Sequence, residues 1–493
     1  MAATRVIVIG AGVGGLSAAI GLAAQGYAVT VVERAATPGG KMRQLTVGGV
    51  AIDAGPTVFT MRWVFEALFD ASGAAFADYV GLQPVTTLAR HAWGPDERLD
   101  LFADLAQSTA AIGAFAGAAE AHRFERFCAE AARTYRTLEG NFMTRQRTTP
   151  WGLAARIGAS RPQDLLSIKP FETLWQALGG YFHDPRLRQL FGRYATYSGA
   201  SPFAAPATLM LIAHVENSGV WAVDGGMYAL AQGLERRARE LGVAFRYDVE
   251  CAEIGVASGG VEAVVLRSGE RLAADAIVVN ADPAALAALC FGKAAAHAVR
   301  ATPPTARSLS AMTWTGYAPT QGFPLAHHNV FFSNDYRAEF DALAAGRLPT
   351  DPSVYICAPD RSTMPDLRGA ERLHMIVNAP ATGDALSGEE LDACETAMFN
   401  RLAACGLTLS QRTGVRTTPA DFDRLFPATG GALYGRASHG WMASFLRPGA
   451  RTRIPGLYLA GGATHPGAGV PMAAISGRLA ASALMADRAS TAG

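Results

Sequence analysis

The sequence predicts an α/β protein organised around a Rossmann-like dinucleotide-binding domain, and three observations support this. The apolar run 5–10 leads into the glycine-rich turn Gly10-x-Gly12-x-x-Gly15. An apolar helix and a second strand at 28–32 then complete a βαβ unit. A further apolar run near the C-terminus ends in another glycine-rich loop and a helix, between 456 and 485. We therefore expect widely separated segments to build one nucleotide-binding domain.

Amino-acid composition excludes several other classes of protein. The chain has 493 residues, of which 50% are hydrophobic and 17% are charged, and this excludes a disordered or fibrous protein. Its formal net charge of +1 gives no global field for nucleic acid or an anionic membrane, so a nucleic-acid partner is not expected. The 6 cysteines form no C-x-x-C pair, which favours a reduced, intracellular protein without disulfides or a zinc site.

The first βαβ unit could be mistaken for a membrane span. Residues 6–24 carry no charge, but they contain five glycines, which would weaken a single spanning helix. We predict a buried strand over 5–10, a helix over 16–26 and a strand over 28–32. No other apolar run is long enough to cross a bilayer. The protein is therefore expected to be soluble or peripherally attached, on the cytoplasmic side.

Each part of the first motif has a physical reason. Gly10 permits the tight turn, Gly12 lets the backbone approach a pyrophosphate, and Gly15 allows the helix to pack closely on the strand. The N-terminus of the helix, which includes Gly14, offers N–H donors and partial positive charge to phosphates. Glu33 ends the second strand and can accept hydrogen bonds from ribose hydroxyls.

The middle of the chain alternates between the two expected domains. A strand and turn at 50–57 precede a helical, irregular region. A glycine turn at 224–226 then begins a helix over 227–241, followed by a strand at 243–249, a hairpin at 259–260 and a strand at 276–280. Further strands are expected near 309–317, 353–358 and 373–378. We assign 1–70, 222–290 and 420–493 to the nucleotide domain, and 71–221 and 291–419 to an α+β substrate domain.

A helical cap is expected within the substrate domain at 100–200. Its segment 145–175 mixes aromatic residues with arginine and lysine, including Arg161 and Lys169. Such a stretch could lie on a membrane surface or be a solvated cap, and the sequence leaves both open.

The C-terminal segment predicts a second ligand-facing helix N-terminus. A strand ends at Ala460, a glycine-rich loop follows, and a helix runs from Met472 to Met485. Pro471 suits the first turn of that helix because proline lacks the N–H that has no intrahelical partner there. The positive end of the helix would favour negative charge on a bound ring system.

Two motifs make a family resemblance specific. The run Glu33-Arg-Ala-Ala-Thr-Pro-Gly-Gly-Lys41 resembles the second glycine signature of flavoproteins related to amine oxidases and carotenoid desaturases. Thr464-His-Pro-Gly-Ala-Gly469 is similar to the terminal signature of bacterial-type phytoene desaturases. Shorter runs, among them Thr60-Met-Arg-Trp63 and Gly219-Val-Trp221, look most like 1-hydroxycarotenoid 3,4-desaturases, also called methoxyneurosporene dehydrogenases.

The resemblance implies that FAD is the cofactor. Many relatives carry arginine where this chain has Lys41, so the contact there is expected to differ. Carried over position by position, the FAD-binding residues would be Gly10, Gly12, Gly14, Gly15, Glu33, Arg34, Gly39, Gly40, Lys41, Met42, Gly55, Pro56, Thr57, Val249, Gly461, Gly462, Gly469, Val470, Pro471 and Met472.

The implied reaction introduces a C=C bond at C3–C4 of a 1-hydroxycarotenoid such as 1-hydroxyneurosporene, in carotenoid biosynthesis. Hydride would pass from C4 to flavin N5 and a proton would leave C3, with the conjugated chain stabilising the charge. A strong base is not required, and His465 is the candidate for assisting proton transfer. The substrate implies contact with a membrane surface, and oxygen or a quinone would reoxidise the flavin.

Several alternatives stay open at this point. The protein could be a phytoene or neurosporene desaturase or a carotene isomerase of the same family, or a carotenoid carrier that keeps flavin as a structural element. It could more remotely be a flavin amine oxidase, with Lys169 or Lys293 as the lysine near the flavin. Neighbouring His327 and His328 are interpreted as an exposed turn and not as metal ligands.

Overall fold

The computed structural model describes residues 3–492 apart from 159–163, 165–167, 258 and 365. Arg161, part of the basic segment singled out in the sequence, lies outside these described residues.

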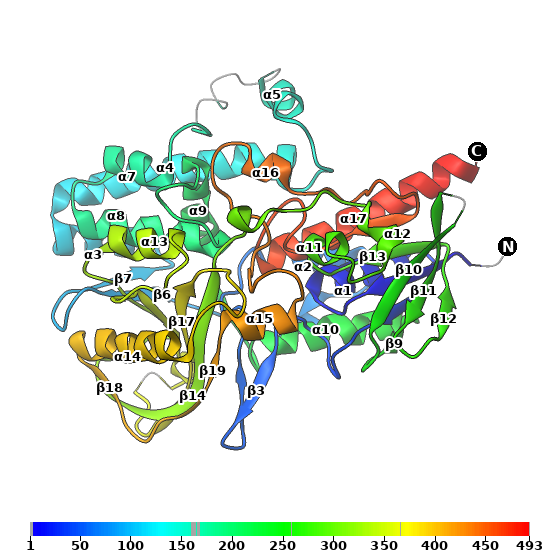
Figure 1. The fold of residues 1–493 in the computed structure, drawn as a ribbon. Coiled ribbons are helices and arrows are strands. Elements are labelled where there is room, and N and C mark those ends of the chain that lie inside the picture. Colours follow the sequence, from blue (N-terminus) through cyan, green and yellow to red (C-terminus); the bar gives the residue numbers. More distant parts are fainter. Residues whose placement is uncertain (1–2, 159–163, 165–167, 258, 365, 493) are drawn as a thin grey trace.

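One half of the molecule is built on a five-stranded parallel sheet (Figure 1). Its order is β20 (Leu457–Leu459), β13 (Ala276–Val279), β1 (Arg5–Ile9), β2 (Ala28–Val32) and β9 (Ala244–Arg246). The strands come from the start, middle and end of the chain, which confirms the α/β fold class and the Rossmann-like sheet. The strand expected over 243–249 is shorter than predicted.

Helices cover one face of this sheet and a small antiparallel meander covers the other. Alternate residues of β1 divide between them: Val6 and Val8 pack with α1 (Val13–Ala23), α10 (Met227–Glu240) and α17 (Val470–Ala492). Ile7 and Ile9 pack against the meander of β10 (Cys251–Ala257), β11 (Gly260–Leu266) and β12 (Arg271–Ala273). The helix α1 begins earlier and α17 extends further than the sequence predicts.

The second half of the molecule is built on an eight-stranded mixed sheet. Its order is β18 (Leu407–Leu409), β14 (Ser310–Gly322), β17 (Ala370–Ala379), β16 (Val354–Cys357), β15 (His328–Phe331), β6 (Thr87–Ala92) and β7 (Arg98–Phe102), with β19 (Thr413–Thr417) also paired to β14. The β15–β6 pair is parallel and its other pairs are antiparallel. The strands expected near 309–317, 353–358 and 373–378 are present.

A layer of helices lies beside this sheet, at the top left of Figure 1. It contains α3 (Leu105–Ala116), α4 (Ala118–Leu138), α7 (Leu174–Tyr181), α8 (Pro185–Gly192) and α9 (Leu211–Asn217). The helix α5 (Pro150–Gly158) stands apart at the top of Figure 1. The helix α14 (Gly388–Ala404) packs beside β16 and β18, and α13 (Tyr336–Ala344) lies near α8.

The remaining elements are short connections. They are β3 (Gln44–Val47), β4 (Val50–Asp53), α2 (Trp63–Asp70), η1 (Phe76–Asp78), β5 (Leu82–Pro84), η2 (Glu139–Met143), η3 (Arg193–Ser198), η4 (Ala207–Met210), β8 (Trp221–Val223), α11 (Pro283–Ala287), α12 (Lys293–Ala296), η5 (Pro304–Ala306), η6 (Pro359–Ser362), α15 (Pro419–Leu425) and α16 (Ala443–Leu446).

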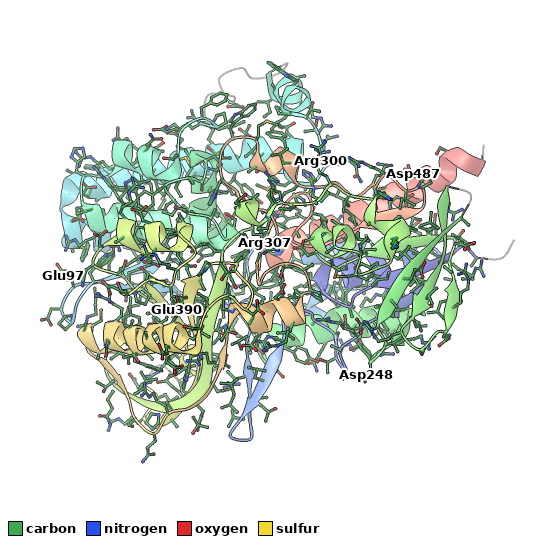
Figure 2. The ribbon with its side chains drawn as sticks, viewed as in Figure 1. Glu97, Asp248, Arg300, Arg307, Glu390 and Asp487 are labelled. Atoms are coloured by element: carbon green, nitrogen blue, oxygen red, sulfur yellow. The ribbon has the colours of Figure 1, made fainter. Side chains whose placement is uncertain are left out.

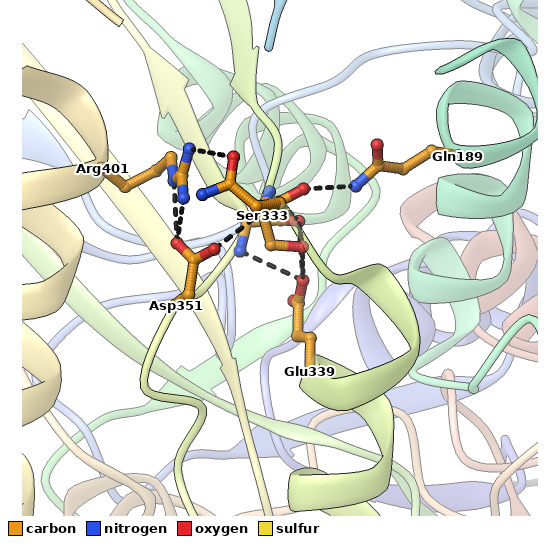
Figure 3. A network of polar contacts seen from close by, with 7 residues as sticks. Gln189, Ser333, Glu339, Asp351 and Arg401 are labelled. Atoms are coloured by element: carbon orange, nitrogen blue, oxygen red, sulfur yellow. Dashed lines mark hydrogen bonds and ion pairs between the residues drawn. The ribbon is translucent and has the colours of Figure 1, made fainter. Parts of the chain in front are cut away.

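A buried polar network ties α8, α13 and α14 to the strand ends (Figure 3). The Glu339 carboxylate accepts hydrogen bonds from the hydroxyls of Ser333 and Ser353 at 2.9 and 2.7 Å. Arg401 donates to Asp351 through Nε at 2.9 Å. Burial raises the pKa of Glu339, and its hydrogen-bond donors oppose this. The carboxyl therefore lies in a polar niche within an otherwise apolar half of the molecule.

The surface carries both signs of charge. Glu97, Asp248 and Asp487 lie towards the periphery in Figure 2, and Glu97 and Asp487 pair with arginines. Among the described residues, we find no helix with both the length and the apolar character needed to cross a bilayer. The uncharged run 6–24 is a strand, a turn and a helix, as predicted.

Candidate active-site cavity

A cavity of about 920 Å³ extends from the carboxyl ends of the parallel strands to the helical layer. Most of the predicted site residues line it. They are Gly10, Gly12, Gly14, Glu33, Arg34, Gly39, Gly40, Lys41, Met42, Gly55, Pro56, Thr57, Val249, Gly461, Gly462, Gly469, Val470, Pro471 and Met472. The structure therefore brings together segments that are more than 400 residues apart in the chain.

The first glycine turn surrounds the side chain of Asn280. A Cβ on Gly12 would lie 2.7 Å from the Asn280 Oδ1, and one on Gly14 would lie 2.7 Å from its Nδ2. Asn280 Nδ2 donates to the carbonyl of Ala460 at 3.0 Å. The amide thus joins the N-terminal turn to the C-terminal strand, and larger residues in the turn would collide with it.

Gly15 has a packing role, as its spacing predicts. A Cβ at this position would lie 2.1 Å from the carbonyl oxygen of Gly10. Gly15 is not among the described residues that line the cavity, so it supports the turn from behind.

Glu33 is fixed by backbone donors on both carboxylate oxygens. Oε2 accepts from the Ala11 N–H at 2.7 Å and Oε1 from the Ala35 N–H at 2.8 Å. Glu33 lines the cavity, and each of its carboxylate oxygens keeps a lone pair beyond these two bonds. The side chain is therefore oriented to accept further hydrogen bonds from ligand hydroxyls.

The second glycine signature lies against the first. Gly39 N donates to the carbonyl of Ala11 at 2.9 Å, and a Cβ on Gly39 would lie 2.3 Å from the carbonyl oxygen of Met42. Lys41 donates to the carbonyl of Leu433. Burial lowers the pKa of Lys41, with Asp282 opposing. The Lys41 amine is thus used within the protein.

The turn after β4 approaches the centre of the cavity. A Cβ on Gly55 would lie 1.9 Å from the carbonyl oxygen of Lys41, so the turn is packed tightly on the second signature. Thr57 Oγ1 and the Tyr355 hydroxyl lie 2.7 Å apart, and Tyr355 also bonds His328 Nδ1 at 2.7 Å. This contact connects the turn after β4 to the eight-stranded sheet.

The C-terminal loop is held by buried polar contacts. Thr464 Oγ1 lies 2.6 Å from the Ser476 hydroxyl of α17. Arg447, which is 2% exposed, donates to the carbonyls of Tyr434, Gly462 and Arg436 at 2.9, 3.2 and 2.6 Å. Burial lowers the pKa of Arg447 to about 10. These contacts fix the loop that leads into the N-terminus of α17.

His465 belongs to this loop, and its side chain packs against the segment 142–145. Its Nε2 is 2.8 Å from the carbonyl oxygen of Arg145 and 3.1 Å from that of Phe142, and the side chain is buried. Burial lowers its pKa, which favours a neutral ring that donates to these carbonyls. Among the described residues that line the cavity, Pro466 and Gly467 are present but His465 is not. The geometry therefore favours a positioning role, and the proton-transfer role stays a prediction.

The histidine pair differs from the exposed turn that the sequence suggests. His328 is 3% exposed because it lies within β15, opposite Cys357 of β16. Ligand atoms of His327, His328 and Cys357 lie within 4.8 Å of one another. Burial raises the pKa of the Cys357 thiol and lowers that of both imidazoles. The three groups are consequently neutral. The interpretation as an exposed turn is wrong for His328, whereas His327 precedes β15 and is half-buried.

Several lining residues were not identified from the sequence. Asn280 ends the strand expected at 276–280 and Asp282 follows it, but neither was among the predicted site residues. Arg447, Arg193, Tyr197 and Glu216 carried no motif at all. Their positions depend on contacts between distant elements, and no local spacing reports such contacts.

The donor set fits FAD. The N-terminus of α1, which has no side-chain cap, and that of α17 meet the cavity at glycine-rich turns, and such termini bind phosphate and negatively charged ring atoms. Glu33 offers acceptors for ribose hydroxyls at the strand end. Beyond these turns the lining is largely apolar, with Phe142, Leu209, Ile212 and Ile376 among its residues. The cavity therefore combines a dinucleotide half with an apolar half.

Comparisons with known proteins agree with this division. The family model described as flavin containing amine oxidoreductase matches residues 13–485. A hydroxyneurosporene desaturase of Rubrivivax gelatinosus is 52% identical, covering 99% of this chain and 94% of its own. That of Rhodobacter capsulatus is 45% identical, covering 99% of both chains.

Solved structures resemble the whole fold. An oxidoreductase from Methanosarcina mazei has a TM-score of 0.59 at 16% identity, covering 98% of this chain and 100% of its own. A putrescine oxidase variant has a TM-score of 0.58 at 14% identity, covering 99% and 100%. At this level of identity the likeness concerns the fold.

Proposed function

Because this chain belongs to the carotenoid desaturases of the flavin-containing amine oxidoreductase family, we propose that it introduces the C3–C4 double bond of a 1-hydroxycarotenoid, with FAD as the oxidant. The similarity to hydroxyneurosporene desaturases over nearly the whole chain carries the proposal. The apolar half of the cavity supports it, since a polyene needs such a lining and an amine does not.

The dinucleotide half of the cavity would hold FAD. The backbone of the turns at 10–14 and 39–42 would contact the pyrophosphate, Glu33 the ribose, and the loop at 461–472 the flavin ring. When bound, FAD supplies the acceptor for the hydride that leaves C4. Oxygen or a quinone would reoxidise it.

The protein's own groups position the substrate and exclude water. The cavity joins the turn at 53–57 to the helical layer, so a polyene inserted into it lies beside the cofactor turns in an apolar channel. The conjugated chain itself delocalises the positive charge that follows hydride loss. A strongly basic side chain at C3 is therefore not required.

We also propose the division into domains that the sequence suggests. The parallel sheet, its helices and the C-terminal helix would form the FAD-binding domain from 1–70, 222–290 and 420–493. The mixed sheet and the helical layer would form the substrate domain from 71–221 and 291–419, with a cap at 100–200.

A membrane surface is the proposed source of the substrate. Three aromatic residues that line the cavity are also exposed: Trp151 at 85%, Phe171 at 80% and Trp441 at 44%. The rings of Phe171 and Trp441 lie 5.4 Å apart. Exposed aromatic side chains at a cavity mouth suit the interface of a bilayer, where they would admit a dissolved polyene.

Vesicle sedimentation tests the membrane proposal. Replacing Trp151, Phe171 and Trp441 with serine should weaken binding to phosphatidylcholine–phosphatidylglycerol vesicles by at least about tenfold, since each buried aromatic side chain contributes on the order of 1.5–3 kcal/mol. Replacing the exposed Leu289 and Met364, which are not among the described residues that line the cavity, should leave binding unchanged. Equal binding by both variants would contradict this surface assignment.

The function is tested by anaerobic incubation of the FAD-loaded protein with 1-hydroxyneurosporene in liposomes. Bleaching of the flavin spectrum together with a product two mass units lighter establishes desaturation. A product of unchanged mass would indicate isomerisation. No product from this substrate, but turnover of phytoene, neurosporene or an amine, would contradict the proposal and identify the alternative.

A further inference from the structure

Three polar side chains interrupt the apolar wall of the cavity on the substrate side. Arg193 and Tyr197 come from η3 and Glu216 comes from α9, and all three line the cavity. Arg193 is 8% exposed and Glu216 is 5% exposed. Burial of such groups is costly unless they are paired, so their presence beside a polyene channel requires a reason.

The hydrogen bonds of this cluster satisfy the carboxylate but not the guanidinium. The Tyr194 hydroxyl donates to Glu216 Oε2 at 2.7 Å, and the Tyr197 hydroxyl donates to Oε1. Arg193 Nη1 donates to the Tyr197 oxygen at 3.3 Å, while its buried Nε has no partner in the described part of the chain. A guanidinium has five N–H donors, so Arg193 retains unused donor capacity.

The charge of the cluster restricts the ligand. Arg193 and Glu216 carry opposite charges, so the pair is neutral overall and does not call for an anion. Burial acts to lower the pKa of Arg193, but Tyr197 and Glu216 outweigh it and the pKa is raised. The side chain therefore stays protonated and can only donate. The fitting ligand is a neutral acceptor, such as a hydroxyl or ether oxygen.

The cluster lines the same cavity as the turn at 54–57, which packs on the second glycine signature. Burial raises the pKa of Tyr355, and the positive charge of Arg193 opposes that rise, so the two groups are within electrostatic reach. The Tyr355 hydroxyl bonds Thr57 of that turn. A substrate oxygen at Arg193 would thus lie in the part of the cavity that Tyr355 and the turn at 54–57 also line.

We infer that Arg193, oriented by Tyr197, binds the oxygen on C1 of the polyene and thereby selects which bond is oxidised; this inference rests on the proposed function. C1 is two bonds from C3, so a fixed oxygen places C3 and C4 at a set distance from the cluster. The oxygen is recognised as an acceptor. Both a 1-hydroxy and a 1-methoxy end therefore fit, whereas a hydrocarbon end leaves the guanidinium unpaired.

The test compares three polyenes of the same chain: 1-hydroxyneurosporene, its 1-methoxy derivative and neurosporene. For the wild-type protein, kcat/KM should be about 100-fold higher with either oxygenated compound than with neurosporene, because an unmatched buried donor is penalised. Arg193→Leu should lower this preference at least about tenfold, and Arg193→Leu/Glu216→Gln should do the same while removing both buried charges.

Tyr194→Phe is the matched control for Tyr197→Phe. Both hydroxyls donate to Glu216, but Tyr197 lines the cavity and Tyr194 is not among the described lining residues. Tyr197→Phe should reduce the preference for the oxygenated compounds, and Tyr194→Phe should leave that ratio unchanged. FAD content and circular dichroism establish that each variant is folded.

Polyene binding gives a second readout that does not depend on turnover. Quenching of tryptophan fluorescence by each compound yields a Kd, and the Kd preference should follow the same order. An unchanged preference in folded Arg193→Leu and in the double variant would overturn the inference. A wild-type protein that binds the hydroxylated polyene preferentially without desaturating it would retain the inference and refute the proposed function.

Discussion

The Glu33 carboxylate offers a direct test of the proposed FAD site. Glu33→Gln replaces one acceptor oxygen with an NH₂ group, so one of the two N–H donors, Ala11 or Ala35, loses its acceptor. The remaining bond becomes neutral. A hydrogen bond to a charged group contributes about 1.5–3 kcal/mol and a neutral one about 0.5–1.5 kcal/mol, so each converted bond loses about 1–1.5 kcal/mol.

Two consequences add in cofactor binding. The ribose hydroxyls would meet a neutral acceptor instead of a charged one, and one of the two backbone N–H groups that hold the side chain, Ala11 or Ala35, would be left without its acceptor. Together we expect a loss of about 2 kcal/mol in FAD binding, which corresponds to an increase in Kd of about 30-fold. The effect should appear in affinity, since Glu33 lies at the dinucleotide half of the cavity.

The assay is titration of the apoprotein with FAD, followed by quenching of flavin fluorescence. Glu262→Gln is the control, because Glu262 is an exposed glutamate that pairs with Arg271 and does not line the cavity. Its Kd should equal that of the wild type. A Glu33→Gln protein that is folded and binds FAD within twofold of the wild type would refute the assignment of Glu33 to the ribose.

Three further substitutions test the supporting contacts. Arg447→Met should lower the free energy of unfolding by about 3 kcal/mol or more, measured by urea titration, because three partly buried carbonyls lose a charged donor; an unchanged midpoint would contradict this. Glu339 has a raised pKa in the folded protein, so its contribution to stability is complete below its ordinary value of 4.5 and is lost as the pH rises through the folded pKa. Glu339→Gln should therefore flatten the fall in urea midpoint above pH 4.5, and an identical pH slope would argue against it. His465→Ala should lower FAD content and unfolding temperature together, because the loop loses its tie to two carbonyls; loss of turnover alone would instead support proton transfer.

The parts of the site that could be predicted from the sequence are those encoded by neighbouring residues. Gly10, Gly12 and Gly15 lie within one turn, and their spacing expresses a steric demand that a Cβ would violate. Glu33 follows because parallel strands end at one edge of a sheet. The C-terminal glycine-rich loop could be predicted for the same reason, because it follows another strand of the same parallel sheet.

The site residues that were not predicted act through tertiary contacts, and the spacing of residues in the sequence does not report such contacts. Arg447 bonds backbone carbonyls, which every residue possesses, and the chain has 43 basic residues from which to choose. Arg193 and Glu216 meet only because η3 and α9 pack together. His328 was interpreted as exposed because polar pairs usually are, yet β-pairing with Cys357 buries it. The partners and the burial of these residues are determined by tertiary packing.

The strand order of the parallel sheet has a consequence for biosynthesis. The edge strand β20 pairs with β13, and the Ala460 carbonyl at its end accepts a hydrogen bond from the Asn280 amide. Both the edge strand and the helix that follows it belong to the last forty residues of the chain. A nascent chain in which β20 and α17 have not yet been synthesised therefore lacks one wall of the cavity. Such a chain should acquire no cofactor, and a nascent chain stalled before β20 should retain none.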